Sequence, residues 1–372
     1  MTLYLGLMSG TSMDGIDAAL LAITDDGMRV QAALCHQWPD ALQSRLRRLA
    51  EQYQHIGLVE LGQLDTSVAR EFAHAAQELL RIANLQPTDI RAVGSHGQTV
   101  LHQPHGAAPF TMQIGDPNVI AERLGIDVVA DFRRRDLAAG GEGAPLMPAF
   151  HAAAFGLPGE LRAVVNIGGI ANVTVLPADA AAHVTGFDTG PGNCLLDSWA
   201  RRHLEHAYDA NGAWAATGTV DAELLARLLS EPYFSRSPPK STGRDTFSDD
   251  WLQRALTGLS LAPADVQATL SELTGQTIAN GLRAYPGAEP ARVLVCGGGA
   301  FNADLLARLA RLLPHSQVGT TATLGIAPEN VEAAGFAWLA HRYVSGLAGN
   351  LPSVTGARHP VPLGALYRGS LL

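Results

Sequence analysis

Small, polar and acidic residues gather between two apolar runs near the start of the chain. The runs extend over Tyr4–Met8 and Ile16–Ile23, and Ser9–Gly15 lies between them. This pattern predicts two strands joined by an open polar turn. Glycine lets a ligand approach the backbone closely, and the N–H groups and hydroxyls of such a turn can face a phosphate chain. Asp14 and Asp17 could hold a hydrated metal ion there.

An ordinary hairpin with a polar tip has a similar composition, because turns favour these residues in any case. Recurrence of the pattern favours a ligand. In Ala163–Leu176 a strand meets the pair Gly168-Gly169, here called the second turn, and another strand follows. Further on, the apolar strand Arg292–Cys296 runs into Gly297–Gly299, the glycine triplet, and then into a helix. Strand, glycines and helix favour a nucleotide site, since the helix N-terminus faces the ligand.

Other polar side chains follow buried strands directly, where ligand groups are usual in an α/β sheet. Ala92–Gly94 runs into the polar loop Ser95–Thr99, and Ile126–Ala130 runs into Asp131 and Arg133. We expect the last two side chains to point into a cleft.

Two further carboxylates have both a structural and a chemical interpretation. Asp188 lies in a glycine-rich strand end that opens the helix Cys194–His203, so it is either a turn and capping residue or a catalytic one. Glu332 lies in the first turn of the helix Pro328–Tyr343, where an acid also suits the helix dipole.

Apolar periodicity predicts the elements that position these groups. Helices are expected over Asp40–Gln54 and Leu58–Asn84, and a short helix capped by Asp116 ends at Leu124. Gly- and Pro-rich residues at Ala138–Pro148 indicate a domain boundary nearby. The tail, Asn350–Tyr367, is expected to be mostly irregular.

Composition excludes several classes of protein. The 372 residues predict two domains, and the net charge of −9 argues against a general nucleic-acid or anionic-membrane binder. Three cysteines, far apart and without a CxxC pair, argue against a disulfide framework or a zinc site and fit a cytoplasmic protein. We expect no signal peptide and no transmembrane helix.

The order of the glycine-rich turns resembles the actin / sugar kinase / heat-shock ATPase superfamily. That resemblance implies a two-domain actin-like ATPase (ribonuclease H-like) α/β fold, with mixed central sheets flanked by helices and an active site in the interdomain cleft. Domain I is expected over 1–130 plus 344–372, with the first phosphate hairpin and part of a sugar site. Domain II is expected over 131–343, with the second hairpin, the catalytic aspartate and the adenosine glycine turn.

More specific motifs resemble the anhydro-N-acetylmuramic acid kinases over nearly the whole chain. The stretches that carry this resemblance are Gly6–Asp17, Gly94–Thr99, Asp131–Arg133 with Gly140–Pro145, Asn166–Asn172, Phe187–Asn193 and Leu351–Ala357. The resemblance implies an ATP-dependent kinase of peptidoglycan recycling. Such an enzyme opens the 1,6-anhydro ring of 1,6-anhydro-N-acetylmuramic acid with water and phosphorylates O6, giving N-acetylmuramic acid 6-phosphate and ADP. It further implies a homodimer.

The chemistry of that reaction assigns roles. A water molecule must attack the anomeric carbon, so a base is needed, and Asp188 is the candidate catalytic residue. Arg133 is the candidate partner of the lactyl carboxylate, with His96, Gln98, Asp131 and, by family position, Glu332 as further sugar-binding residues.

ATP is expected to bind the three glycine-rich turns. Its candidate residues are Gly10, Thr11, Ser12, Met13, Asp14, Gly15, Ile16, Asp17, Asn166, Gly168, Gly169, Gly297, Gly298 and Gly299. The wider superfamily has an aspartate where this chain has Met8, so Asp14 or Asp17 is the candidate ligand of Mg²⁺.

Three rival functions fit parts of the same pattern. A phosphatase or polyphosphate hydrolase on this fold would need no muramyl pocket. An ATP-regulated binding protein like the heat-shock ATPases would need a peptide-binding domain, and none is recognisable. A kinase of an ordinary amino sugar would use the same Asp188 on a substrate hydroxyl.

Overall fold

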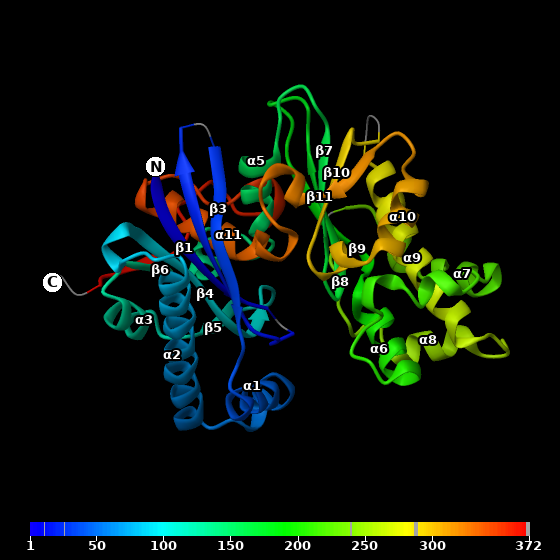
Figure 1. Cartoon of the computed structure of the whole chain (residues 1–372), viewed down its shortest axis with the longest axis horizontal. Coiled ribbons are helices and arrows are strands. Elements are labelled where there is room, and N and C mark those ends of the chain that lie inside the picture. The colour runs from blue at the N-terminus through cyan, green and yellow to red at the C-terminus, as the bar shows by residue number, and fades with distance from the viewer. Residues whose placement is uncertain (11, 26, 239, 286–288, 370–372) are drawn as a thin grey trace. The chain divides into compact units, whose positions relative to one another are not determined.

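The chain forms two compact units in the computed structural model, which describes residues 1–10, 12–25, 27–238, 240–285 and 289–369. Unit 1 comprises Met1–Phe150 and Asn330–Leu372, and unit 2 comprises His151–Glu329. These boundaries differ from the expected ones after residues 130 and 343. The reason is that α4 (Phe132–Ala138) and α11 (Val331–Val344) pack on strands of unit 1, and the boundary after Phe150 falls within α5 (Met147–Phe155). α11 and α5 are labelled in Figure 1.

Unit 1 is built on a sheet in the order β12-β6-β4-β1-β2-β3, with β5 paired to β4. β1 is antiparallel to β2 and parallel to β4. The strands are β1 (Thr2–Ser9), β2 (Ile16–Thr24), β3 (Gly27–His36), β4 (Ile90–Gln103), β5 (Phe110–Ile114), β6 (Val128–Ala130) and β12 (Ala365–Tyr367).

Helices cover both faces of this sheet. Alternate residues of β1 join a core with α1 (Asp40–Gln52), α2 (Leu58–Ile82) and α3 (Pro117–Leu124). On the other face α11 lies so close that a Cβ at Gly6 or Gly94 would overlap its backbone carbonyl groups. Glycine at these two strand positions therefore lets the helix that begins beside Glu332 pack directly on the sheet.

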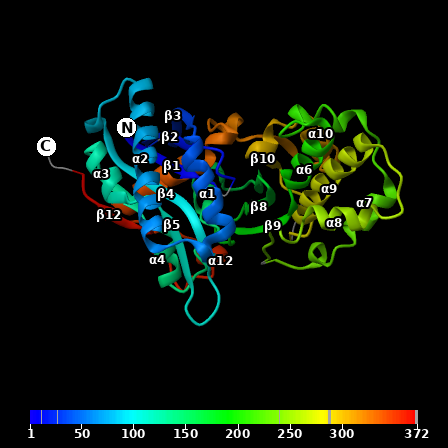
Figure 2. The same ribbon diagram turned by 90° about the horizontal axis from the view of Figure 1, so that it is seen from below.

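Unit 2 has a sheet in the order β11-β10-β7-β8-β9. Its strands are β7 (Arg162–Ile167), β8 (Ile170–Leu176), β9 (Thr185–Pro191), β10 (Arg292–Cys296) and β11 (Gln317–Thr320). Side chains of α9 (Pro263–Arg283) and α10 (Ala303–Leu312) form a core with one face of the sheet. A second core joins α9 to α6 (Asn193–Leu204), α7 (Ala222–Leu229) and α8 (Asp249–Leu256), which lie together in Figure 2.

The two sheets repeat one topology. The order β3-β2-β1-β4-β6 in unit 1 corresponds to β9-β8-β7-β10-β11 in unit 2. In both, the first two strands form an antiparallel hairpin, and the first strand pairs in parallel with a later one. This duplicated mixed sheet with flanking helices confirms the predicted actin-like α/β fold.

One local prediction differs from the structure. Ser95–Thr99 lies inside β4 and not in a loop, because β4 continues to Gln103 and pairs with β5. The tail is mostly irregular, as predicted, and contains α12 (Pro352–Thr355) and β12, which pairs with β6. The glycine triplet leads through a 3-10 turn, Gly298–Phe301, into α10, which begins at Ala303 after Asn302.

Candidate active site

The polar stretch Ser9–Gly15 between β1 and β2, called the first turn, is held by hydrogen bonds at both ends. The Ser9 hydroxyl donates to the Gly15 carbonyl at 2.8 Å, and the Met13 N–H donates to the Gly10 carbonyl at 3.2 Å. The Gln98 side-chain amide also donates to the Gly10 carbonyl, at 3.2 Å. Gln98 thus contacts the proposed phosphate turn, and its buried Oε1 has no hydrogen-bond partner among the described residues. An unpaired buried acceptor of this kind needs an explanation, and a bound ligand is one.

Side chains of the first turn divide into two groups. Met13 and Ile16 are buried in the core of unit 1, so their side chains are not open to a ligand. Ser12 and Asp14 are exposed, and Asp17 is half-buried at the start of β2. Thr11, also predicted to contact ATP, lies outside the described residues.

Asp17 is the carboxylate of this turn whose position is fixed by neighbours. It faces Cys35 across the β2–β3 pair, and the thiol hydrogen-bonds to it. Partial burial, reinforced by the charge of Asp17, raises the pKa of Cys35 to about 12. Among the described residues no group of three or more His, Cys, Asp or Glu side chains could hold a metal ion by itself. Mg²⁺ bound to a nucleotide needs only one or two carboxylates besides water and phosphate, so Asp14 and Asp17 fit that requirement.

The second turn, Gly168-Gly169, joins β7 to β8 and lies against the start of α6. Its carbonyl groups accept hydrogen bonds from the N–H groups of Gly192, Asn193 and Cys194. The structure leaves open space at Gly168, where a Cβ would come no closer than 3.7 Å to any heavy atom outside its immediate neighbours. Gly10 in the first turn is equally open, with 3.8 Å to the nearest such atom. Packing therefore does not require glycine at either position. Close approach of a ligand to the backbone would explain why glycine is present there.

The glycine triplet lies beside the second turn within unit 2. β10 is parallel to β7 with Cys296 opposite Asn166, so both glycine turns leave the same edge of the sheet. Gly297 has a φ of 76°, and a Cβ there would overlap the Asn166 side chain. Gly299 is packed against Ile167 in the same way, whereas Gly298 has room for a methyl group.

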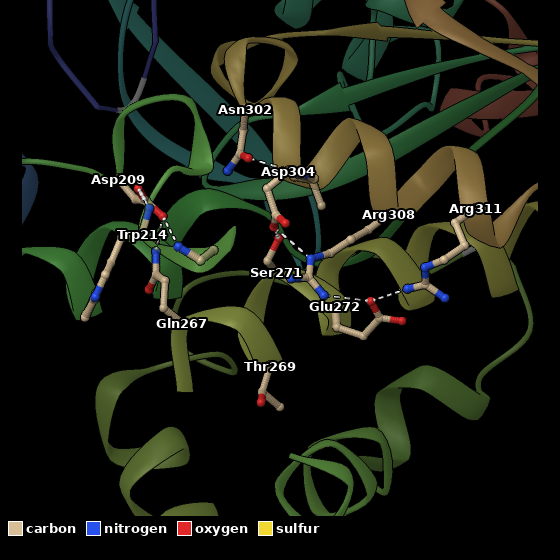
Figure 3. A network of polar contacts seen from close by, with 12 residues as sticks. Asp209, Trp214, Gln267, Thr269, Ser271, Glu272, Asn302, Asp304, Arg308 and Arg311 are labelled. Carbon is tan, nitrogen blue, oxygen red and sulfur yellow. Dashed lines mark hydrogen bonds and ion pairs between the residues drawn. The ribbon is translucent and has the colours of Figure 1, made fainter. Parts of the chain in front are cut away.

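A polar network between α9 and α10 fixes the helix that follows the triplet (Figure 3). Asn302 caps α10 by accepting the Leu305 N–H at 3.0 Å, and Asp304 accepts from Ser271 of α9 at 2.7 Å. Glu272 of α9, only 4 % exposed, receives Arg308 and Arg311 of α10 at 3.1 and 2.6 Å. These bonds fix α10 against α9. Because the glycine triplet directly precedes α10, its position on the sheet is fixed as well.

Asp188 lies on β9 with one carboxylate oxygen engaged. Its Oδ2 accepts the Thr242 N–H at 3.0 Å, and its own carbonyl accepts from the Tyr233 hydroxyl at 2.7 Å. No hydrogen bond to Oδ1 occurs among the described residues. Burial raises the pKa of Asp188 above its ordinary value, and the Thr242 N–H only partly opposes this. A partly desolvated carboxylate with one free oxygen has the properties of a general base.

Arg133, His96 and Glu332 form a second cluster, in unit 1. The Arg133 Nε donates to His96 Nε2 at 2.8 Å, and His96 Nδ1 lies 2.9 Å from the Gly97 carbonyl, so the ring is neutral and protonated on Nδ1. Burial and the neighbouring guanidinium hold the pKa of His96 well below its usual range. Burial lowers the pKa of Arg133 to about 10, and burial raises the pKa of Glu332 despite the attraction of Arg133. This cluster offers a cation, with an acid nearby, to a polar ligand.

Asp131 is not part of that cluster, although the sequence placed it with Arg133. Its backbone has a φ of 61°, and its carboxylate accepts from the Tyr367 hydroxyl at 2.8 Å and pairs with Arg134 at 3.4 Å. Asp131 lines a surface pocket with Arg134 and Ala365, as expected of a cleft-facing residue, but Arg133 does not line that pocket. The two side chains are separated because β12 brings Tyr367 beside β6.

Two groups of residues near these sites were missed in the sequence. One is Asp136, fully buried, which accepts from Gly143, Asn350 and Thr355 and so ties the Gly- and Pro-rich loop to the tail. The other is the segment Lys240–Phe247, which contacts Asp188. Only its unusual mixture of glycine, hydroxyl and cationic residues could have drawn attention to it.

Repeated sheets, glycine turns open to a ligand and a partly buried carboxylate together define the class of actin-like phosphotransferases. A family model described as anhydro-N-acetylmuramic acid kinase matches residues 2–369. The chain is 53% identical over 369 residues to the "Anhydro-N-acetylmuramic acid kinase" of Xanthomonas axonopodis pv. citri, covering 98% of each chain. It is 50% identical over 368 residues to the protein of the same name from Shewanella loihica, covering 99% of each. The chain belongs to the anhydro-N-acetylmuramic acid kinase family and is a kinase, as the sequence motifs predicted.

Solved structures with detectable likeness are much more distant. A ROK family glucokinase from Streptomyces griseus, in complex with glucose and AMPPNP, has a TM-score of 0.42 and 16% identity, covering 91% of this chain and 99% of that chain. Component A of the Acidaminococcus fermentans (R)-2-hydroxyglutaryl-CoA dehydratase has a TM-score of 0.49 and 13% identity, covering 91% and 96%. Likeness at this level carries no argument about function. Separately, no helix among the described residues combines the length and apolarity needed to span a membrane.

Proposed function

We propose that this protein opens the 1,6-anhydro ring of 1,6-anhydro-N-acetylmuramic acid with water and phosphorylates the released O6 with ATP. The products are N-acetylmuramic acid 6-phosphate and ADP, and the process served is peptidoglycan recycling. The observation that carries the proposal is the family match over residues 2–369. The environment of Asp188 supports it, because a ring opened by water needs a base.

The reaction proceeds in two coupled steps. Asp188 takes a proton from water as the water oxygen bonds to C1, and the C1–O6 bond breaks. O6 then bonds to the γ-phosphorus as the bond between that phosphorus and the β,γ-bridging oxygen breaks, and ADP leaves. The raised pKa of Asp188 suits this role, since a stronger base accepts the proton more readily.

We propose that ATP lies on the two glycine turns and the triplet, with Asp17, assisted by Asp14, holding its Mg²⁺. When bound, Mg²⁺ would neutralise phosphate charge. Open backbone at Gly10 and Gly168 supports this assignment, as does the unpaired Gln98 oxygen next to Gly10.

We assign the sugar to unit 1, with Arg133 as partner of the lactyl carboxylate and Glu332 and His96 as hydrogen-bonding groups. Arg133 already donates to His96 and Gly143, which orients its guanidinium group for a planar anion. Gln98 and Asp131 are also proposed sugar contacts; Gln98 has a free Oε1, and Asp131 already accepts a hydrogen bond from Tyr367. A cytoplasmic location and a homodimer are also proposed, the first in keeping with three free cysteines.

The test is ADP release with ATP and Mg²⁺ in the presence of the anhydro sugar, of N-acetylmuramic acid, or of neither. Turnover with the anhydro sugar and ¹⁸O from water at C1 of the product is the expected result. Equal turnover with the open sugar would identify an ordinary sugar kinase. ATP hydrolysis that neither sugar changes would identify a phosphohydrolase.

A further inference from the structure

The segment Lys240–Phe247 is fastened to β9 beside Asp188. The Asp188 N–H donates to the Lys240 carbonyl at 3.2 Å, and the Thr242 N–H donates back to the Asp188 carboxylate at 3.0 Å. The segment is thus held beside β9, which is the edge strand of the unit 2 sheet. Any residue that follows Thr242 closely is held near the proposed base.

The other end of the segment is anchored in the aromatic core of unit 2. Phe247 is only 1 % exposed and stacks on Phe234 with ring centroids 5.4 Å apart and planes at 12°. The Gly243 carbonyl accepts the N–H groups of Thr246 and Phe247, so the connection is a tight turn. With both ends fixed, the residues between them are displayed in one place.

Arg244 lies between these anchors and against the second turn. A Cβ built on Gly169 would lie 2.7 Å from Arg244 Nη2 and 2.9 Å from its Nε, so the guanidinium group packs on the glycine backbone itself. The side chain is exposed, and it makes no hydrogen bond or ion pair with any residue that the structure describes. Its donors are therefore available to a ligand on this turn.

The other cation of the segment is already committed. Lys240 donates to the carbonyls of Tyr233 and Phe234 at 3.4 and 3.3 Å, and its Nζ lies 4.8 Å from the centre of the Tyr233 ring. Lys240 therefore stabilises the local fold, and Arg244 is the cation of this segment whose donors can bind a ligand.

We propose that Arg244 is a catalytic residue that binds the terminal phosphoryl group of ATP and stabilises the charge on it during transfer to O6. A guanidinium group matches phosphate oxygens with paired N–H donors, and an arginine placed at the transferring group accelerates many phosphoryl transfers. This inference rests on the function proposed above, since it needs ATP on the second turn. It adds to that site a residue that lies outside every sequence motif described above.

The experiment compares Arg244→Gln and Arg244→Lys with the matched control Arg254→Gln. Arg254 is an exposed arginine of α8 in the same unit, whose side chain has no polar partner among the described residues. For each variant we would measure kcat, KM for ATP and KM for the anhydro sugar, together with the binding of ADP and of a non-hydrolysable ATP analogue. Thermal melting checks that each variant is folded.

We expect Arg244→Gln to lower kcat/KM for ATP by about 10²–10³-fold, as for other lost donors to a transition-state charge. Binding of the ATP analogue should weaken at least tenfold while ADP binding changes less than about twofold, since ADP lacks the terminal group. Arg244→Lys should recover part of the loss, and Arg254→Gln should behave as the wild type.

Equal weakening of ADP and analogue, or a rise confined to the KM of the sugar, would overturn the assignment to the terminal phosphoryl group. Unchanged kinetics in a folded Arg244→Gln protein would do the same. If the wild-type protein hydrolyses ATP without using the sugar, the proposed function fails, and the nucleotide-binding comparison still decides the role of Arg244.

Discussion

The first turn and the second turn occupy equivalent places in two sheets of the same topology. The charged side chains beside them are opposite in sign, acidic at the first turn and basic at the second. The first, in unit 1, carries Asp14, and Asp17 follows it at the start of β2. The second, in unit 2, is only Gly168-Gly169 and has the guanidinium group of Arg244 packed on it. Repeated topology thus fixes where a ligand-binding turn lies, and the residues around each turn decide which partner it suits. Acidic groups suit a phosphate through Mg²⁺, whereas a cation suits it directly.

The largest effect we expect lies in unit 2, at Asp188. Asp188→Asn should lower kcat by about 10²–10⁴-fold, since the amide cannot accept the proton of water. Ionised Asp188 is the active form, and burial raises its pKa above the ordinary 3.8. As the pH is lowered, the wild-type rate should therefore begin to fall at a higher pH than an exposed aspartate would give. The measurement is the pH profile of ADP release.

Asp179→Asn serves as the control for that change. Asp179 is exposed, and its carboxylate accepts the Ala181 N–H in a turn, a bond that asparagine can keep. A loss below about fivefold in Asp188→Asn would remove Asp188 from the chemistry and leave unit 2 with nucleotide binding alone.

Mg²⁺ dependence should separate the two turns. Asp17→Asn is expected to raise the Mg²⁺ concentration for half-maximal rate by about 10–100-fold, the range typical of disturbed metal sites. Asp14→Asn should change it less, because Asp14 is exposed, and Arg244→Gln should leave it unaltered. Titration of Mg²⁺ at saturating ATP measures this. Equal shifts in Asp17→Asn and Arg244→Gln would contradict a division of labour between an acidic and a basic turn.

The glycine turns show how much of such a site can be predicted from sequence. Alternating or continuous apolar runs followed by glycine located β1, β7 and β10 well, and β10 has the predicted bounds Arg292–Cys296. The pattern is local, because a strand and the turn that ends it are adjacent in the chain. For the same reason the buried face of α1, with Leu42, Leu46 and Leu49, could be predicted.

Partners distant in sequence could not be predicted in this way. Asp131 and Arg133 were expected to point into one cleft, but Asp131 lines a pocket that does not include Arg133 and accepts a hydrogen bond from Tyr367, 236 residues further along the chain. Arg244 gave no signal, since its segment has no periodicity and gains its meaning only where it packs on Gly169. Residue types and spacing were therefore enough to locate the turns. Which side chains lie beside each turn depends on tertiary packing and could not be predicted.

Methyl groups on the open glycines compare the turns more finely. Gly10→Ala and Gly168→Ala should each raise KM for ATP about tenfold, the equivalent of one weakened hydrogen bond to a charged group. Neither should lower the melting temperature appreciably, because the added Cβ meets no atom closer than 3.7 Å. Gly299→Ala is the contrasting control and should destabilise the protein, since its Cβ would overlap Ile167. An effect at Gly168 without one at Gly10 would confine the phosphates to the second turn.

The smallest effect we predict compares a buried histidine of each unit. Burial lowers the pKa of His151 in unit 2 to about 3 and holds that of His96 in unit 1 well below its usual range. Below pH 6.5 these two imidazoles bind protons in the unfolded chain but stay neutral in the folded protein. The free energy of unfolding therefore falls as the pH is lowered. Each histidine can contribute up to about 1.4 kcal/mol per pH unit until its own folded pKa is reached.

His151→Gln and His96→Gln should each flatten this slope in urea unfolding between pH 6.5 and 4.5. The comparison with wild type at each pH cancels Asp188 and Glu332, whose raised pKa values act in the opposite direction. His183→Gln, at an exposed histidine, should leave the slope unchanged. If only one of the two buried variants flattens the slope, only one of the two units keeps its buried histidine neutral over this pH range. The two units would then share a topology but not the electrostatic properties of their cores.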